Sequence, residues 1–213
     1  MNNWAKIKPD KIPTSTEIDN DFWGYFKKGD KILDVGCGIG KNIMKCLSKG
    51  LEITGIDINK EAIKIAKNNQ NLLSAEIFAE DILNSKFKGF NGVLLQGVLC
   101  TMTEKERVRC LKKVKEALIK GGILHVAEFE SNNDNIERYK KDFELTKEWG
   151  TLSIKDVLDG EEICPSHQFS EKEIVNLLKD FKILSFKRKI FISYHGNKIP
   201  GIIIIAQKYK NGK

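Results

Sequence analysis

The sequence has no long apolar run. Its longest aliphatic stretch, Ile202–Ala206, is only the length of a strand, whereas a membrane-spanning helix needs about 18 or more apolar residues. The first residues, Met1–Lys11, hold neither the apolar segment nor the small-residue cleavage site of a secretory signal. We therefore expect a cytoplasmic protein without a membrane partner.

Paired cysteines are also lacking. An odd, scattered set predicts reduced thiols within a core rather than a disulfide framework, and it favours a reducing compartment. The nearest approach to a metal pattern is Cys164 with His167, which has no second ligand pair, so we expect no metal site. The five cysteines are Cys37, Cys46, Cys100, Cys110 and Cys164.

Arginine is scarce for so basic a chain. The formal net charge is +7, yet nearly all of the excess comes from lysines spread over expected helix faces. Nucleic-acid recognition favours clustered cations and the fork of Arg. Solvated helix faces explain the charge better, and RNA is kept as a second candidate partner. The arginines are Arg107, Arg109, Arg138 and Arg188.

From Lys31 onward, short β-branched runs alternate with helical segments, which is the pattern of βαβ units and a parallel sheet. Glycine pairs, capping residues and capping boxes set the predicted boundaries. The predicted strands are 31–35, 52–56, 75–78, 92–96, 123–128, 183–188 and 201–207, the last two pairing antiparallel. The predicted helices are 41–49, 60–68, 103–119 and 170–179.

The most informative segment is Ile32-Leu-Asp-Val-Gly-Cys-Gly-Ile-Gly40, where a strand runs into a glycine-rich turn and then a helix. Glycines here let the backbone approach a ligand and expose the amides of the helix N-terminus. Lys41 stands where the dinucleotide fingerprint has its third glycine, which argues against an NAD-dependent enzyme. An acid, Asp57, follows about 20 residues later, where a Rossmann fold binds ribose hydroxyls.

Together with Gly55-Ile-Asp57, this segment resembles the first two motifs of class I S-adenosylmethionine-dependent methyltransferases. Ala79-Glu-Asp-Ile82, Phe90–Leu99 and Leu118–Leu124 are similar to later motifs of the same family. The sequence departs from them at Asn91, where Asp is usual, and at Lys120, where Pro is usual. The resemblance covers about residues 20–129.

The resemblance implies S-adenosylmethionine as cofactor and S-adenosylhomocysteine as product. It places the glycines beneath the methionine part, Asp34 near its ammonium group, Asp57 at the ribose and Asp81 at the adenine. Helix capping by Asp57 and a solvated loop position for Asp81 are the alternatives. The implied cofactor-binding residues are Asp34, Gly36, Cys37, Gly38, Gly40, Asp57, Ile58, Asp81, Ile82, Gln96 and Gly97.

The implied fold is a three-layer α/β/α sandwich, Rossmann-like, around a mostly parallel seven-stranded sheet with an antiparallel last strand. We expect one domain over residues 1–213. Residues 1–28 carry an aromatic cluster that suits either a cap over the substrate opening or packing against the first helix. Residues 129–168, a long interval with apolar residues among charges, are the expected substrate lid, with a structural appendage as the alternative.

The leading function is methylation of a small-molecule acceptor. An RNA or protein methyltransferase is the alternative, and a non-catalytic cofactor-binding subunit is a third reading. Asn/Asp-Pro-Pro-aromatic and Pro-Cys signatures are absent, which disfavours amino-group and cytosine-C5 nucleic-acid methylation. A base is optional because the sulfonium leaving group is already good.

His167 is the candidate catalytic base. Other titratable groups on the same side of the expected sheet are Glu128, Glu130, Tyr194 and His195, the last of which suits a turn. His125 lies within a predicted strand and is expected to be structural.

Overall fold

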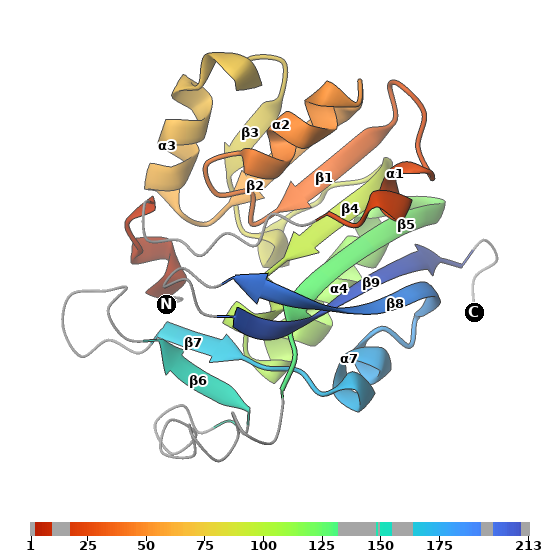
Figure 1. Cartoon of the computed structure of the whole chain (residues 1–213). Helices are drawn as coiled ribbons and strands as arrows, with labels where there is room; N and C mark the ends of the chain where they lie inside the picture. Colours follow the sequence, from red (N-terminus) through yellow and green to blue (C-terminus); the bar gives the residue numbers. More distant parts are fainter. Residues whose placement is uncertain are drawn as a thin grey trace.

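The computed structural model describes residues 3–9, 18–131, 148, 150–154, 164–192 and 198–209. A seven-stranded sheet runs through its middle, with the strands in the order β3-β2-β1-β4-β5-β9-β8 (Figure 1). The strands are β1 (Lys31–Val35), β2 (Glu52–Asp57), β3 (Glu76–Ala79), β4 (Phe90–Gln96), β5 (Leu118–Phe129), β8 (Phe181–Ile192) and β9 (Lys198–Lys208).

Strands β1 to β5 pair in parallel, whereas β9 runs antiparallel to both β5 and β8. The predicted mostly parallel sheet with an antiparallel last strand is therefore confirmed. Strand β9 lies between β5 and β8, and its residues Ile202–Ala206 are all buried.

Helices cover both faces of the sheet, so that the fold has three layers (Figure 1). Side chains of successive strand residues point to opposite faces, and Ile32 and Leu94 accordingly belong to one core, while Leu33 and Leu95 belong to the other. The first core lies under α1 (Asn20–Trp23), α2 (Lys41–Ser48) and α3 (Lys60–Asn68), and the second lies under α4 (Glu104–Ala117) and α7 (Glu171–Leu177).

Strand β5 differs from its prediction. Helix α4 was expected to run to residue 119 and the strand to begin at residue 123, but the helix ends at Ala117 and the strand begins at Leu118. Phe90 pairs with Leu118 and Gly92 pairs with Ile123, so β5 bulges between them. The pair of glycines ends no helix. Gly121, with φ of 77°, instead supplies the bulge.

A second, two-stranded sheet of β6 (Thr151–Ile154) and β7 (Cys164–His167) was not predicted. Both strands are too short and polar for an alternation to stand out in the sequence. They lie within the interval 129–168, of which residues 132–147, 149 and 155–163 fall outside the described part. Among the described residues there are also four 3-10 turns: η1 (Asn3–Lys6), η3 (Gln70–Leu72), η4 (Ile82–Asn84) and η5 (Leu99–Thr101).

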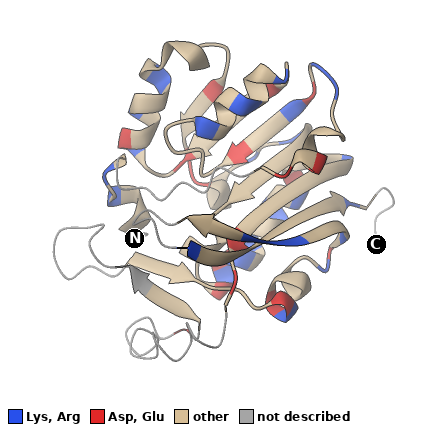
Figure 2. Cartoon of the chain, in the orientation of Figure 1, with Lys and Arg blue, Asp and Glu red and all other residues tan. Residues whose placement is uncertain are grey.

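All five cysteines are buried free thiols, as predicted. No helix among the described residues is long and apolar enough to cross a membrane. Lys and Arg are interspersed with Asp and Glu over the described elements (Figure 2), which agrees with the reading of the positive charge as solvated lysines.

Candidate functional site

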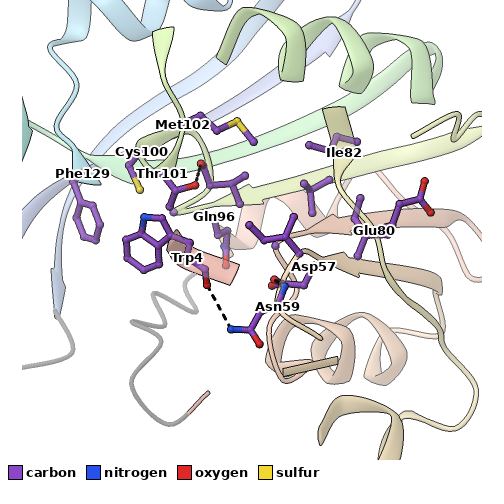
Figure 3. A pocket seen from close by; sticks show the side chains of 16 residues that line it. Trp4, Asp57, Asn59, Glu80, Ile82, Gln96, Cys100, Thr101, Met102 and Phe129 are labelled. Atoms are coloured by element: carbon purple, nitrogen blue, oxygen red, sulfur yellow. Dashed lines mark hydrogen bonds between the residues drawn. The ribbon is translucent and has the colours of Figure 1, made fainter. Parts of the chain in front are cut away.

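A cavity of about 130 Å³ lies over the edge of the sheet where the carboxyl ends of β1 to β5 meet (Figure 3). Parallel strands bring their last residues to one edge, and residues from far apart in the sequence therefore line a common space. Of the predicted cofactor residues, six line this cavity: Gly36, Asp57, Ile58, Ile82, Gln96 and Gly97.

The glycine-rich turn connects β1 to α2, and its glycines lie in different environments. A Cβ atom at Gly36 would lie 2.6 Å from Cγ2 of Val98, so the close approach of two chain segments requires glycine there. A Cβ at Gly38, where φ is 53°, would meet nothing within 4 Å. Space is therefore open beside Gly38. The side chain of Cys37 is buried in the core, and Gly40 is the left-handed N-cap of α2.

Asp57 ends β2 and joins two backbone segments of the site. Its Oδ2 accepts a 2.8 Å hydrogen bond from the amide of Gly38, and its Oδ1 accepts one of 2.8 Å from the amide of Asn59. Burial raises the pKa of Asp57, and the backbone donors partly offset that rise. Each carboxylate oxygen keeps further acceptor capacity, and Asp57 can therefore accept from ligand hydroxyls.

A buried polar group lies behind the turn. Asp34 is 1% exposed, and neither of its carboxylate oxygens has a hydrogen-bond partner. Burial raises the pKa of Asp34 to about 7, and the nearby amide of Asn42 offsets only part of the rise. The amide of Asn42 donates to Oε1 of Gln96 at 2.8 Å. An unpaired buried carboxylate is costly, so this position favours a cationic or hydrogen-bond-donating ligand nearby.

The segment after β3 contributes Glu80 and Ile82 to the cavity. Asp81 is not among the lining residues; its Oδ1 accepts from the amide of Leu83 at 2.9 Å and so caps η4. The acidic side chain that reaches the cavity here is Glu80, one residue before the predicted position. Ile82 is buried and presents an apolar surface to the cavity (Figure 3).

Glu128, near the end of β5, holds the opposite side of the cavity in place. Its carboxylate accepts from three consecutive amides, those of Val98 at 3.0 Å, Leu99 at 2.8 Å and Cys100 at 3.2 Å. Burial raises the pKa of Glu128 to about 7 despite these donors. The group was considered as a base from the sequence, but the structure ties it to η5, where it fixes the backbone that lines the cavity.

The N-terminal turn η1 covers the cavity. Trp4 lines it (Figure 3). Its indole Nε1 donates to the carbonyl of Pro165 in β7 at 2.8 Å. The side-chain amide of Asn59 donates to the carbonyl of Ile7 at 2.7 Å and reaches that of Trp4 at 3.5 Å. Of the two readings of the N-terminal aromatics, packing over the opening describes Trp4, while Trp23 packs edge-to-face on Phe22 away from the cavity.

His167 lies in a buried cluster outside the lining of the cavity. Its Nδ1 lies 2.8 Å from the hydroxyl of Thr151, and its Nε2 lies 2.8 Å from Oε1 of Glu173. Arg107, itself 1% exposed, binds Glu148 at 2.6 Å beside this histidine. Both ring nitrogens are thus engaged in holding β6, β7 and α7 together.

Other predicted groups are placed as follows. His125 is fully buried and accepts a 3.0 Å hydrogen bond from the amide of Asp19, and burial lowers its pKa to about 4. It is structural, as predicted. Glu130 pairs with Arg188 at 2.7 Å. Tyr194 and His195 lie outside the described residues.

A family model described as "Methyltransferase domain" matches residues 26–182 of the chain. Among solved structures, a methyltransferase from Methanosarcina mazei, described as S-adenosylmethionine-dependent, is 36% identical with a TM-score of 0.83 and covers 92% of this chain and 100% of its own. A Burkholderia thailandensis 1,6-didemethyltoxoflavin-N1-methyltransferase with bound S-adenosylhomocysteine is 17% identical with a TM-score of 0.63, over 85% of this chain and 72% of its own, and shares the fold.

Among curated proteins, a ribosomal protein L11 methyltransferase from Thermotoga neapolitana is 27% identical over 144 residues, which are 62% of this chain and 52% of the relative. A carboxy-S-adenosyl-L-methionine synthase from Dichelobacter nodosus is 25% identical over 61% of this chain and 58% of the relative. The chain spans about half the length of the curated relatives that it matches, and their named activities differ.

Proposed function

Because the chain belongs to the class I S-adenosylmethionine-dependent methyltransferase family, we propose that it transfers a methyl group from S-adenosylmethionine to a small-molecule acceptor. The cavity at the carboxyl ends of β1 to β5 supports this proposal, since open α/β sheets bind their ligands at that edge.

The observation that carries the proposal is the unpartnered carboxylate of Asp34 behind the glycine turn. An amino-acid ammonium group supplies the cation that this buried acid lacks. Asp57 offers acceptors for ribose hydroxyls, and Ile82 offers an apolar surface for adenine. Gly38 leaves open space beside the turn. The residues present therefore fit S-adenosylmethionine.

When bound, the cofactor supplies an electrophilic methyl group and a good leaving group, so no residue of the chain has to form a covalent bond. The chain's own part is to bind and orient the cofactor and the acceptor and to exclude water. Glu128 fixes the backbone of residues 98–100, of which Val98 and Cys100 line the cavity beside β4 and β5. Trp4 covers the cavity.

The size of the cavity supports a small acceptor. At about 130 Å³, it is smaller than common ligand cavities of about 300–1,000 Å³, so its lining has to widen for the cofactor to enter. A polymer would need a wider opening still. A protein or RNA acceptor is the second candidate, favoured by the ribosomal protein L11 and 23S rRNA methyltransferases among the curated relatives.

The first experiment is a thermal-shift comparison of S-adenosylhomocysteine with NAD. We expect the former to raise the melting temperature and the latter to leave it unchanged, since a ligand selective for the native state stabilises it by mass action. Stabilisation by NAD alone would contradict the proposal.

The second experiment screens consumption of the methyl donor across metabolite and RNA pools. Turnover with metabolites supports the small-molecule acceptor, whereas turnover with RNA alone would replace it with the second candidate. Cofactor binding without turnover in either pool or with ribosomal proteins would favour a non-catalytic cofactor-binding subunit.

A further inference from the structure

The two ends of the cavity have different chemistry. Polar side chains, those of Asp57, Asn59 and Glu80, gather at one end, whereas Trp4 and Phe129 lie at the other (Figure 3). The polar end belongs to β2 and β3, where the nucleoside half of a cofactor is expected. The aromatic end lies over β4 and β5 and is left for the acceptor.

The indole of Trp4 is held in a defined position. Its single polar group, Nε1–H, donates to the carbonyl of Pro165, and what the rest of the side chain offers a ligand is an apolar ring. The backbone of the same turn is fixed by Asn59, which also caps α3 through a 3.0 Å bond from the amide of Ala62. Ile7, at the other end of this segment, is fully buried.

Phe129 is fixed as well. It ends β5, and its ring packs edge-to-face on Phe191 at a centroid distance of 6.1 Å. Between the rings and the glycine-rich turn, the cavity is lined by Val98, Cys100 and Met102. Thr101 also lines it, and its hydroxyl donates to the carbonyl of Val98 at 2.7 Å. Burial raises the pKa of the Cys100 thiol well above its ordinary value, and the thiol is therefore uncharged. This end of the cavity combines two ordered aromatic rings with aliphatic and sulfur surfaces.

We propose that the acceptor is a small, flat, uncharged and largely apolar molecule that binds against Trp4 and Phe129, and that Trp4 is the residue that determines this specificity. The proposal rests on the proposed function, because it assigns the acceptor end of the same cavity. An ordered indole binds a flat ring through stacking or edge contacts at a small conformational cost. A charged acceptor would lose its hydration there without gaining a counter-charge from these side chains.

The test uses two probes and the full chain. Binding of 2-naphthol to the protein saturated with S-adenosylhomocysteine is measured by calorimetry, and methylation of 2-naphthylmethanethiol, whose alkyl thiol is uncharged at neutral pH, is measured from labelled S-adenosylmethionine. Homocysteine, which is charged and aliphatic, is the contrasting thiol. We expect 2-naphthol to bind, and 2-naphthylmethanethiol to be methylated at least ten-fold more efficiently than homocysteine.

Variants then assign the preference to Trp4. Trp4→Ala is expected to weaken 2-naphthol binding and to raise the KM for 2-naphthylmethanethiol by about ten-fold, with the affinity for S-adenosylhomocysteine changed less than two-fold. Trp4→Phe keeps an aromatic ring and should restore most of the effect. Trp23→Ala, which removes an indole outside the cavity, is the matched control and should leave both values unchanged.

The outcomes separate the two proposals. Failure of the wild-type protein to bind S-adenosylhomocysteine would refute the proposed function itself. Cofactor binding without 2-naphthol binding, or acceptor parameters insensitive to Trp4→Ala, would overturn only the acceptor assignment. Methylation of an RNA oligonucleotide or a lysine peptide with equal efficiency in wild type and Trp4→Ala would overturn it too, because a polymer would then use another surface.

Discussion

Cofactor affinity is expected to depend on pH through Asp34. This carboxyl is buried without a hydrogen-bond partner, and its pKa is raised to about 7 by burial. An ammonium group beside it lowers that pKa toward the ordinary value, so the ligand binds the ionised form and expels the proton at low pH. Below pH 7, removal of this proton opposes binding, and affinity falls as the pH falls.

The magnitude follows from the pKa. With a pKa of about 7 in the free protein, about nine in ten Asp34 carboxyls are protonated at pH 6 and about half at pH 7. The Kd for S-adenosylhomocysteine is therefore expected to be about five-fold higher at pH 6 than at pH 7. The ligand's ammonium group stays charged over this range and contributes no pH dependence of its own.

Calorimetry in two buffers of different ionisation enthalpy measures the Kd and the number of protons released on binding. We expect release of close to one proton per ligand at pH 6 and about half a proton at pH 7. Asp34→Asn keeps the shape of the side chain and removes the titration, so its weaker binding should show no such pH dependence. A pH-independent Kd without proton release in the wild-type protein would refute the reasoning and remove Asp34 from the cofactor site.

Three further predictions test other parts of the structure. Asp57→Ala should weaken S-adenosylhomocysteine binding by about 1.5–3 kcal/mol, as for a hydrogen bond to a charged group. Gly38→Leu should fill the open space beside the turn and should also weaken S-adenosylhomocysteine binding. Unchanged calorimetric affinity in both variants would contradict the cofactor placement. His125 is neutral when buried, with a pKa of about 4, so its contribution to stability is complete above about pH 6.5 and falls by about 2 kcal/mol at pH 5; denaturant unfolding of His125→Gln should lack this loss, and equal losses in both proteins would disprove it. Glu128→Ala leaves three buried amides without their acceptor and should lower the unfolding free energy by more than about 2 kcal/mol, whereas Glu128→Gln should retain most of it; an equal loss in the two variants would show that the charge, rather than the acceptor oxygens, matters.

Local patterns in the sequence predicted the positions of those cavity residues that lie close to the carboxyl ends of their own strands. The glycine turn, Asp57 and Ile82 lie at or just beyond the ends of β1, β2 and β3, and a parallel sheet brings such positions together whatever the rest of the chain does. The positions of these strand ends required only the order of the elements, whereas the role of Ile82 came from the resemblance to the methyltransferase motifs.

The remaining contacts depend on packing between distant segments, which no local pattern encodes. Trp4 meets Pro165 across 161 residues of sequence, and the side chain of Glu128 folds back onto η5. One signal was available, however. Arg107 stands at the helical spacing of the buried residues Cys110, Leu111 and Val114 of α4 and so falls on the core face, which predicts a buried arginine in need of acids.

His167 shows why a residue type alone is a weak guide to catalysis. Its position at the end of β7 places it near the expected substrate side, but its two ring nitrogens face Thr151 and Glu173. A histidine with both nitrogens engaged in a buried cluster serves the packing of the surrounding strands first. Its catalytic role stays a prediction, which turnover of His167→Ala at saturating cofactor tests.

The place of β9 in the sheet has a consequence for synthesis of the protein on the ribosome. Strand β8 joins the sheet through β9 alone in the described structure, and β9 is translated after it. The strands that frame the cavity are complete once residue 129 has been made, whereas β9 ends about 80 residues later, which is roughly 4–16 s of translation. During that interval the outer edge of β5 has no partner, and such an open edge invites pairing with other chains. We therefore expect nascent chains stalled before residue 198 to depend on chaperones far more than the finished protein does.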